Sequence, residues 1–494
     1  MNNFAFMSAT DMSAVVRKKE VSPVELTQYF LKRIEERNPS LNALVYTDPE
    51  KALERARQIE AKIMAGESVG ILAGVPTAAK DFIPSLPGWK GSFGGIKGLA
   101  HMEDTHYSTY SKCFLDEGAV FLGKTNSPSF AFRGTCDNLL YGPTCNPFET
   151  TRNSGGSSGG SSAAVADGLL PIAQGSDGGG SIRIPAAWCG LYGFKASVGT
   201  ISNAPRPNAF GTSYPYCFEG AQTRSVADAA LALNAMAGYD PFDPNSRDYG
   251  NIDYFSALSG SIKGKRIGFT ADFGIFPVDQ EIKDIVEKAA RAFEDAGAIV
   301  EPVQFNFTHT AFEFAECWCR LISIGGGIDS FEDFKAIGYD LLKDYAQDLP
   351  NELIYWVNDA YSRSYVDFFR DQTIRTQVYD EIQKAFQTYD YIVSPVTACH
   401  PVKNDPNRNT LGPTEINGEK VEPLIGWCLT FFCNFTGHPA ASIPAGLSKE
   451  GLPVGMQLIG RRFDDMSVLT ASAEYERIRP WTHIYELTQK RPLL

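Results

Sequence analysis

Apolar positions at helical spacing dominate the first 65 residues. Ser22-Pro-Val-Glu25 is a capping box with proline at the first helical position, and Pro39 stops the helix that it opens. Asp48-Pro49 opens a second helix, for which Gly66 is a suitable C-cap. The predicted buried positions are Leu26, Phe30 and Ile34 in the first helix and Ala52, Ala56, Ile59 and Ile63 in the second. Residues 1–65 are therefore predicted to form a helical region.

From Gly70 onwards, short apolar runs alternate with helical patterns, which is typical of an α/β sheet protein. Residues 262–304 predict a strand, a helix capped by Asp279 that ends at Gly297, and a second strand, which together serve as scaffold. The predicted strands are 119–122, 169–173, 266–269, 299–303, 391–393, 440–443 and 455–459.

Two serine-bearing glycine loops lie between Asn153 and Ala196, at residues 155–160 and 177–181. Runs of glycine and serine are usually flexible linkers. These loops, however, continue directly into apolar flanks, which a linker would lack. We therefore expect buried loops around one short helix and one short strand, where backbone N–H groups can crowd a small reacting group.

Three chemistries use loops of this kind. A Walker phosphate cradle needs a lysine, and residues 153–194 contain none. A nucleophile elbow occurs literally at residues 155–159 and would make Ser157 the nucleophile of an α/β-hydrolase. The polar, proline-led residues 147–153 lack the alternation of the strand that should precede an elbow, and histidines are scarce downstream. The third chemistry is acyl transfer with a lysine as the base.

Lys80 is the candidate base, because it ends the apolar run 70–79. An unperturbed lysine has a pKa near about 10.4 and is protonated at neutral pH, but burial can lower that pKa by several units. A neutral Lys80 could then accept a serine proton. A strand end that carries its ammonium group into water is the alternative interpretation.

With these segments the chain resembles the amidase signature family of serine hydrolases. The matching segments are Leu72-Ala-Gly-Val-Pro76 with Lys80-Asp81, Gly123-Lys-Thr-Asn126, Gly155-Gly-Ser-Ser-Gly-Gly160, Asp177-Gly-Gly-Gly-Ser-Ile-Arg-Ile-Pro185 and Leu452-Pro-Val-Gly-Met-Gln-Leu-Ile-Gly460. The resemblance implies one α/β domain over residues 1–494, with a mixed β-sheet core surrounded by α-helices. Residues 66–494 would form the amidase signature core.

The resemblance also implies a catalytic triad. Ser181 would be the nucleophile, Ser157 a bridging serine after a cis peptide bond, and Lys80 the base in a proton relay. The 24-residue step between the two serines agrees with the family pattern. The family usually carries a side chain where this chain has Gly178. The implied oxyanion donors are the backbone N–H groups of Gly178, Gly179, Gly180 and Ser181.

Further side chains are candidates for orienting the loops or binding substrate. Asp177 and Arg183, with Ser158, are expected to orient the loop, and an ordinary surface ion pair is the alternative for the first two. The aromatic-rich segments 204–219 and 312–320 are interpreted as irregular insertions that line either the pocket or the core. The candidate substrate contacts are Cys317, Trp318, Trp427 and Phe431, which suggest an apolar or aryl substrate.

Composition narrows the partners and the location. The net charge of −13 disfavours nucleic acid or an anionic membrane as a partner. The ten cysteines lack zinc-ligand spacing and indicate reduced thiols, so neither a metal nor another cofactor is expected. The N-terminal residues lack a basic leader followed by an apolar run, and no stretch reaches transmembrane length. We expect a cytoplasmic enzyme, and the family resemblance is compatible with a homodimer.

The sequence therefore predicts an amidase that hydrolyses a small carboxamide or a linear or cyclic oligoamide through an acyl-enzyme on Ser181. The alternative is the glutaminase subunit of a tRNA-dependent amidotransferase. Its glutamine pocket pairs an arginine with an aspartate. Arg375 matches the arginine, but Trp427 stands where we place the aspartate, seven residues before Asn434. A silent binding protein with this fold would need a broken triad, and all three triad positions are intact.

Overall fold

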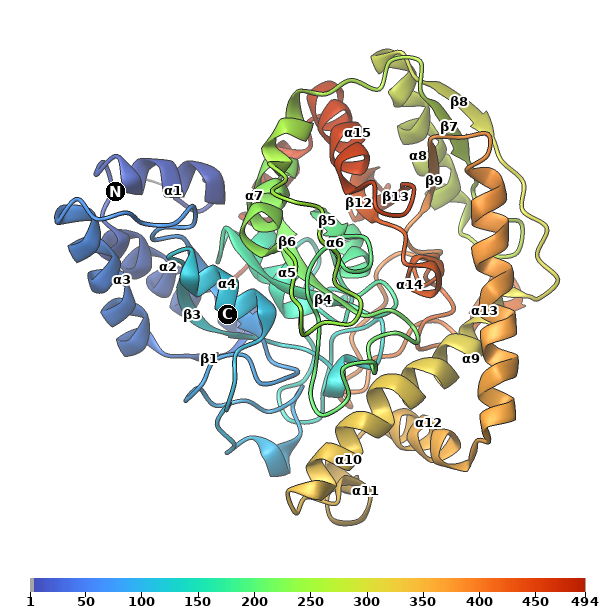
Figure 1. The fold of residues 1–494 in the computed structure, drawn as a ribbon, viewed down its shortest axis with the longest axis horizontal. Helices are drawn as coiled ribbons and strands as arrows, with labels where there is room; N and C mark the ends of the chain where they lie inside the picture. The colour runs from blue at the N-terminus through green and yellow to red at the C-terminus, as the bar shows by residue number, and fades with distance from the viewer. Residues whose placement is uncertain (1–3, 494) are drawn as a thin grey trace.

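An eight-stranded sheet forms the centre of the structure, a computed structural model that describes residues 4–493 (Figure 1). Its strands are β4 (Ile172–Asp177), β5 (Tyr192–Lys195), β6 (Phe218–Thr223), β7 (Arg266–Phe269), β8 (Ile299–Pro302), β9 (Tyr391–Pro395), β12 (Ala440–Leu447) and β13 (Pro453–Ile459). They lie in the order β4-β6-β5-β12-β13-β9-β7-β8. The neighbours from β4 to β9 are antiparallel, and β7 runs parallel to β9 and β8. The predicted mixed sheet is confirmed, and every predicted strand outside residues 119–122 overlaps one of its strands. The predicted strand 169–173 shares only Ile172 and Ala173 with β4.

A smaller sheet brings Lys80 to the edge of the central one. It consists of β1 (Leu44–Thr47), β3 (Val120–Thr125) and β2 (Pro76–Lys80), with β3 in the middle. The hydroxyl of Thr77 donates to the carbonyl of Ile172 at 3.1 Å, and the N–H of Lys80 donates to the side chain of Gln174 at 2.8 Å. These bonds hold the end of β2 against β4. The short strands β10 (Glu415–Ile416) and β11 (Glu419–Lys420) pair separately.

The predicted N-terminal helices are confirmed as α2 (Pro23–Arg37) and α3 (Pro49–Met64), which follow α1 (Ala9–Arg17). The hydroxyl of Ser22 accepts the N–H groups of Val24 and Glu25 and so caps α2. Gly66 has a φ of +76° just after α3, as a C-terminal glycine should. The strand β1 between these helices pairs with β3, so this region shares a sheet with the rest of the chain.

The remaining helices surround the sheets (Figure 1). They are α4 (Thr109–Asp116), α5 (Gly159–Ala166), α6 (Arg183–Trp188), α7 (Val226–Met236), α8 (Gln280–Arg291), α9 (Ala311–Ile322), α10 (Asp329–Ala336), α11 (Leu341–Asp344), α12 (Asn351–Ser362), α13 (Tyr365–Ala385), α14 (Phe432–Thr436), α15 (Asp465–Ile478) and α16 (Tyr485–Thr488). Asp279 caps α8 as predicted. None of the helices in residues 4–493 is both long and apolar enough to cross a lipid bilayer.

One structural prediction is wrong, because residues 312–320 are not an irregular insertion. They lie in α9, where Thr310 and Glu313 form a capping box and Phe314, Trp318 and Leu321 are buried on one face. A π-helical segment, Ser323–Ile328, joins α9 to α10. The other aromatic-rich segment, residues 204–219, is irregular up to β6, and its Arg206-Pro207 and Tyr214-Pro215 bonds are cis.

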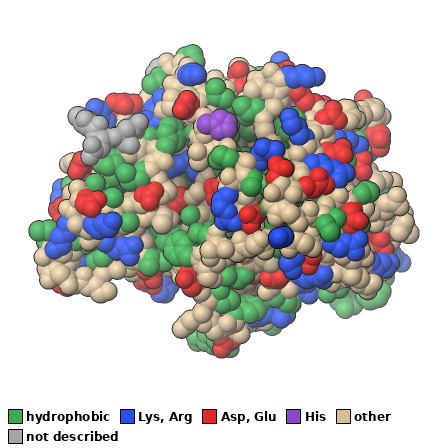
Figure 2. All heavy atoms as spheres, turned by 90° about the horizontal axis from the view of Figure 1, so that it is seen from above, with side chains coloured by type: hydrophobic (Ala, Val, Ile, Leu, Met, Phe, Trp, Pro, Cys, Tyr) green, Lys and Arg blue, Asp and Glu red, His purple; other side chains and the backbone are tan. Residues whose placement is uncertain are grey.

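The apolar core is continuous from Phe4 to Tyr485, so the described residues share one interior. The first three residues and the last one of the predicted 1–494 domain lie outside the described part. On the face drawn in Figure 2, acidic and basic side chains are interspersed rather than gathered by sign. That face therefore shows no large surface patch of a single charge sign.

Candidate active site

Lys80 lies fully buried where β2 meets β4. Its Nζ donates to the Oγ of Ser157 at 2.7 Å and to the Oγ of Ser176 at 2.8 Å. The ring of Phe82 lies 4.5 Å from the same nitrogen. The alternative of a strand end that extends its ammonium group into water is therefore wrong.

Burial determines the protonation of Lys80. Because the ammonium group is cut off from water, its pKa falls from the ordinary 10.5 to about 7, although Cys136 and Asp177 act in the opposite direction. About half of the molecules then carry a neutral amine at pH 7. A neutral amine next to two hydroxyl groups is able to accept a proton.

Ser157 and Ser158 stand on the loop before α5. The peptide bond between Gly156 and Ser157 is cis, as the resemblance implied. The N–H of Ser158 donates to the carbonyl of Ser181 at 3.3 Å, and its hydroxyl accepts the N–H of Ser176 at 3.2 Å. Ser158 thus ties the two glycine loops together. The polar residues that lead into Ser157 form isolated bridges rather than the strand that an elbow requires.

Ser176 is a contact that the sequence interpretation missed. It and Gln174 share one face of β4, because side chains of a strand alternate. The side chain of Gln174 accepts a hydrogen bond from the backbone N–H of Lys80, and the hydroxyl of Ser176 accepts one from the Nζ of Lys80. The two-residue spacing of these polar side chains along β4 was the signal.

In the glycine loop after β4, the backbone carbonyl groups accept hydrogen bonds, whereas several backbone N–H groups have no partner among the described residues. The carbonyls of Gly178, Gly179 and Gly180 accept from Trp318, Thr430 and Ile184 respectively. Among the described residues, the N–H groups of Gly179, Gly180 and Ser181 donate to no partner. Gly180 has a φ of +130°, and a Cβ there would lie 2.0 Å from the hydroxyl of Thr430. The loop therefore offers several free donors in a fixed conformation.

The exposures of the three candidate residues differ. Lys80 and Ser157 are 0% exposed, whereas Ser181 keeps 8% of its surface. Gly178 is also only partly buried. A molecule that approaches from solvent meets Ser181 and the glycine loop before it meets the other two residues.

Asp177 and Arg183 form a buried ion pair beneath this loop, so the surface-pair alternative is wrong. Both side chains are 0% exposed, and Arg183 contacts both carboxylate oxygens, at 2.8 and 3.0 Å. Its other donors bind Thr430, Gln457 and Asn434. Burial opposes ionisation of Asp177, but Arg183 outweighs it and the pKa of the carboxyl is lowered. All five donors of the guanidinium are occupied, which fixes both ends of the loop.

The four proposed substrate contacts, Cys317, Trp318, Trp427 and Phe431, lie in different surroundings. The indole N–H of Trp318 donates to the carbonyl of Gly178 at 2.9 Å, so Trp318 touches the loop. Cys317 points its thiol at the carbonyl of Asp371 on α13. Trp427 is fully buried and stacks on Trp188, with the ring centres 4.7 Å apart.

Phe431 is likewise fully buried in an aromatic cluster of the core, where it packs on Phe276, Phe432 and Phe435. Its position, and those of Cys317 and Trp427, are decided by packing that periodicity does not reveal.

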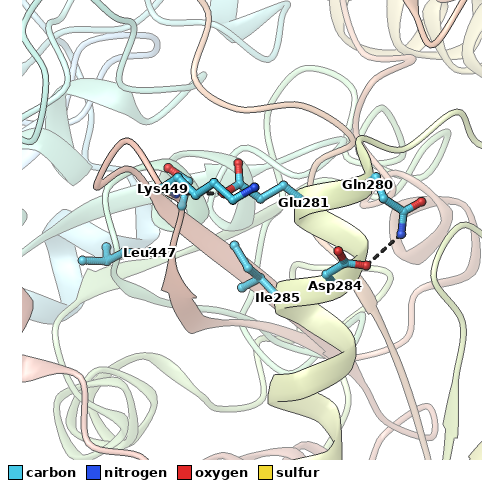
Figure 3. Close-up of a pocket in the computed structure, with 7 residues that line it drawn as sticks. Gln280, Glu281, Asp284, Ile285, Leu447 and Lys449 are labelled. Atoms are coloured by element: carbon cyan, nitrogen blue, oxygen red, sulfur yellow. Dashed lines mark hydrogen bonds between the residues drawn. The ribbon is translucent and has the colours of Figure 1, made fainter.

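A separate surface pocket of about 460 Å³ lies between the first turns of α8 and the turn that joins β12 to β13 (Figure 3). Its polar groups bind one another: Gln280 donates to Asp284, and the N–H of Lys449 donates to Glu281. None of Lys80, Ser157 or Ser181 lines it. Within residues 4–493, no three His, Cys, Asp or Glu side chains form a group that could hold a metal ion.

Comparison with known proteins identifies the family. The amidase family model matches residues 25–469. This chain belongs to the amidase family. It is therefore a hydrolase of carbon–nitrogen amide bonds, as predicted. Its fold is also that of the family. The crystal structure of a bacterial aryl acylamidase of the amidase signature family matches 99% of both chains with a TM-score of 0.96 and 44% identity.

Two curated relatives represent the two functions considered from the sequence. An acylamidase from Rhodococcus erythropolis is 35% identical over 97% of both chains. A glutamyl-tRNA(Gln) amidotransferase subunit from Carboxydothermus hydrogenoformans is 32% identical over 96% of this chain and 97% of its own. The two identities are similar, so the choice of substrate depends on the site.

Proposed function

We propose that this amidase hydrolyses N-acylated arylamines and related apolar amides through an acyl-enzyme on Ser181. The observation that carries the proposal is the buried contact of 2.7 Å between Lys80 Nζ and Ser157 Oγ, with Ser181 on the exposed side. Similarity to an acylamidase and to the crystal structure of an aryl acylamidase supports the substrate class. A cytoplasmic location is part of the proposal, supported by ten free thiols.

In the proposed mechanism, neutral Lys80 takes the proton of Ser157 while Ser157 takes that of Ser181. The Ser181 oxygen attacks the amide carbon, and the free N–H groups of Gly179, Gly180 and Ser181 receive the negative charge that develops on the carbonyl oxygen. The proton returns to the leaving amine as the carbon–nitrogen bond breaks. Water then attacks the acyl-enzyme by the same relay and releases the carboxylic acid.

Glutamine hydrolysis for a tRNA-dependent partner is the second candidate, favoured by the 32% identity to the amidotransferase protein. Arg375 is the residue that matches the arginine of the glutamine pocket, and its guanidinium is already bound to other parts of the protein. Its guanidinium donates to the carbonyls of Phe435 and Ser213, at 2.6 and 2.9 Å, and lies 4.7 Å from the ring centre of Tyr216. Binding a glutamine carboxylate would require breaking these contacts. We therefore expect kcat/KM for free glutamine to fall well below that for an aryl amide.

Active-site labelling tests the proposal. A fluorophosphonate mimics the tetrahedral intermediate and stays on whichever oxygen attacks. Digestion and mass spectrometry should find the adduct on the Ser181 peptide. Ser157→Ala should slow labelling without moving it, since only the proton path is cut. An adduct on Ser157 that persists at the wild-type rate in Ser181→Ala would support the elbow mechanism instead.

A further inference from the structure

The antiparallel register of β4 and β6 places Cys217 opposite Gly178. Asp177 pairs with Phe218, so the next residue of one strand faces the preceding residue of the other. A Cβ built on Gly178 would lie 3.2 Å from the thiol sulfur of Cys217 and 3.5 Å from Cδ1 of Ile322. These two side chains therefore border the space above the first glycine of the loop.

Gly178 differs from the two glycines that follow it. A Cβ on Gly179 would lie 2.6 Å from the Trp318 ring, and one on Gly180 would lie 2.0 Å from Thr430, so neither position has room. At Gly178 an added methyl group needs only a small shift of its neighbours, and the backbone does not have a positive φ. Glycine at this position is thus not required by the loop conformation.

The three residues around this space also have similar solvent exposure. Gly178, Cys217 and Ile322 are each partly exposed, whereas Asp177, Gly179 and Gly180 beside them are buried. The indole of Trp318 holds α9, and with it Ile322 one turn later, against the Gly178 carbonyl. The backbone of Cys217 is fixed as well, since its N–H donates to Thr212 at 2.9 Å. Hydrogen bonds therefore hold the segments that carry Gly178, Cys217 and Ile322 in place.

From these observations we infer that Gly178, Cys217 and Ile322 form a size filter beside the oxyanion loop that limits which substrate groups reach Ser181. The inference rests on the proposed function. The absent side chain at Gly178 leaves space that Cys217 and Ile322 partly fill, and a bulky acyl or aryl group bound at Ser181 must fit beside these side chains. A pocket that contacts apolar groups discriminates by about tenfold or more for each methylene that fits or fails to fit.

A double-mutant cycle tests the filter. Acetanilide, butyranilide and N-acetyl-1-aminonaphthalene serve as a size series in the acyl and in the amine part. Cys217→Ala should raise the ratio of kcat/KM for the bulky over the small substrate by about tenfold, and Gly178→Ala should lower it by a similar factor. The double variant should return towards the wild-type ratio, because the added methyl group then occupies the space of the deleted sulfur.

Controls separate the filter from general damage. Cys113→Ala on α4 removes an equally half-buried thiol far from the loop in sequence and should leave the ratio unchanged. If Gly178→Ala does not fold, as judged by its thermal melting, Cys217→Leu narrows the opening from the other side and should lower the ratio. Ratios within twofold of wild type in Cys217→Ala, and in whichever narrowing variant folds, would overturn the filter.

The same variants are labelled with a small and a long-chain fluorophosphonate, which measures the opening without relying on an anilide. Cys217→Ala should speed labelling by the long-chain probe relative to the small one. A wild-type enzyme that is labelled on Ser181 but hydrolyses no anilide would refute the proposed substrate class and leave this readout intact. Equal relative rates in all variants would refute the filter while leaving the nucleophile assignment standing.

Discussion

The pH dependence of the proposed reaction is set by the burial of Lys80. Its pKa of about 7, against an ordinary 10.5, corresponds to about 5 kcal/mol of differential stabilisation of the neutral amine. At pH 7 about half of the lysine is neutral, whereas an exposed lysine would be neutral in only about one molecule in 3,000. We expect kcat/KM to rise about tenfold per unit below pH 7 and to stay flat above it.

The assay measures release of an arylamine from an acyl anilide between pH 5 and 10 at constant ionic strength. Lys80→Arg should lose about 10²- to 10⁴-fold in kcat, because the guanidinium stays protonated. Lys195 provides a matched control. It is equally buried with a pKa lowered by burial to about 7, but its ammonium group binds the backbone carbonyls of Ala196 and His438. Lys195→Met should leave the midpoint near pH 7.

The pH dependence of thermal stability gives a second test of the lowered pKa of Lys80. The folded-state pKa of Lys80 lies below its unfolded value, so the buried charge disfavours folding below pH 7, and this penalty is relieved as the pH rises from about 7 to 10.5. Lys80→Met should therefore melt at a higher temperature than wild type, most clearly at pH 6. A midpoint of activity above about pH 9, or a Lys80→Arg enzyme with more than roughly a tenth of wild-type kcat, would refute this reasoning.

Three further changes test the surroundings of the site. Asp177→Asn should destabilise the fold by about 3–5 kcal/mol in denaturant unfolding, because it leaves the buried Arg183 without its counter-ion, and a loss below about 1 kcal/mol would contradict this. Gly180→Ala should lower kcat by about 10²-fold or more, because its Cβ would clash with Thr430 and displace the N–H donors. Burial raises the pKa of Glu422 from 4.5 to about 7, although two backbone N–H groups oppose it, so its contribution to stability is lost as the pH rises through 7. Glu422→Gln should match wild type in melting temperature near pH 4 and exceed it at pH 8.

The sequence alone determined the local elements and the chemistry of the loops. Periodicity and caps located α2, α3 and α8, since these signals lie within a few residues of each other. The glycine and serine spacing around Ser157 and Ser181, together with Lys80 at the end of an apolar run, indicated the family and the candidate site. Residues 312–320 could have been assigned to a helix as well, because the capping box that starts α9 lies in the sequence.

Only the tertiary structure decided what depends on contacts between distant segments. The lowered pKa of Lys80 comes from its burial against β4, where its hydrogen-bond partner Ser176 is 96 residues away along the chain. Phe431 is equally apolar whether it lines a pocket or fills the core, and packing places it in the core. The pairing of β4 with β6 sets Cys217 opposite Gly178, because strand register is fixed by the sheet as a whole and not by either strand.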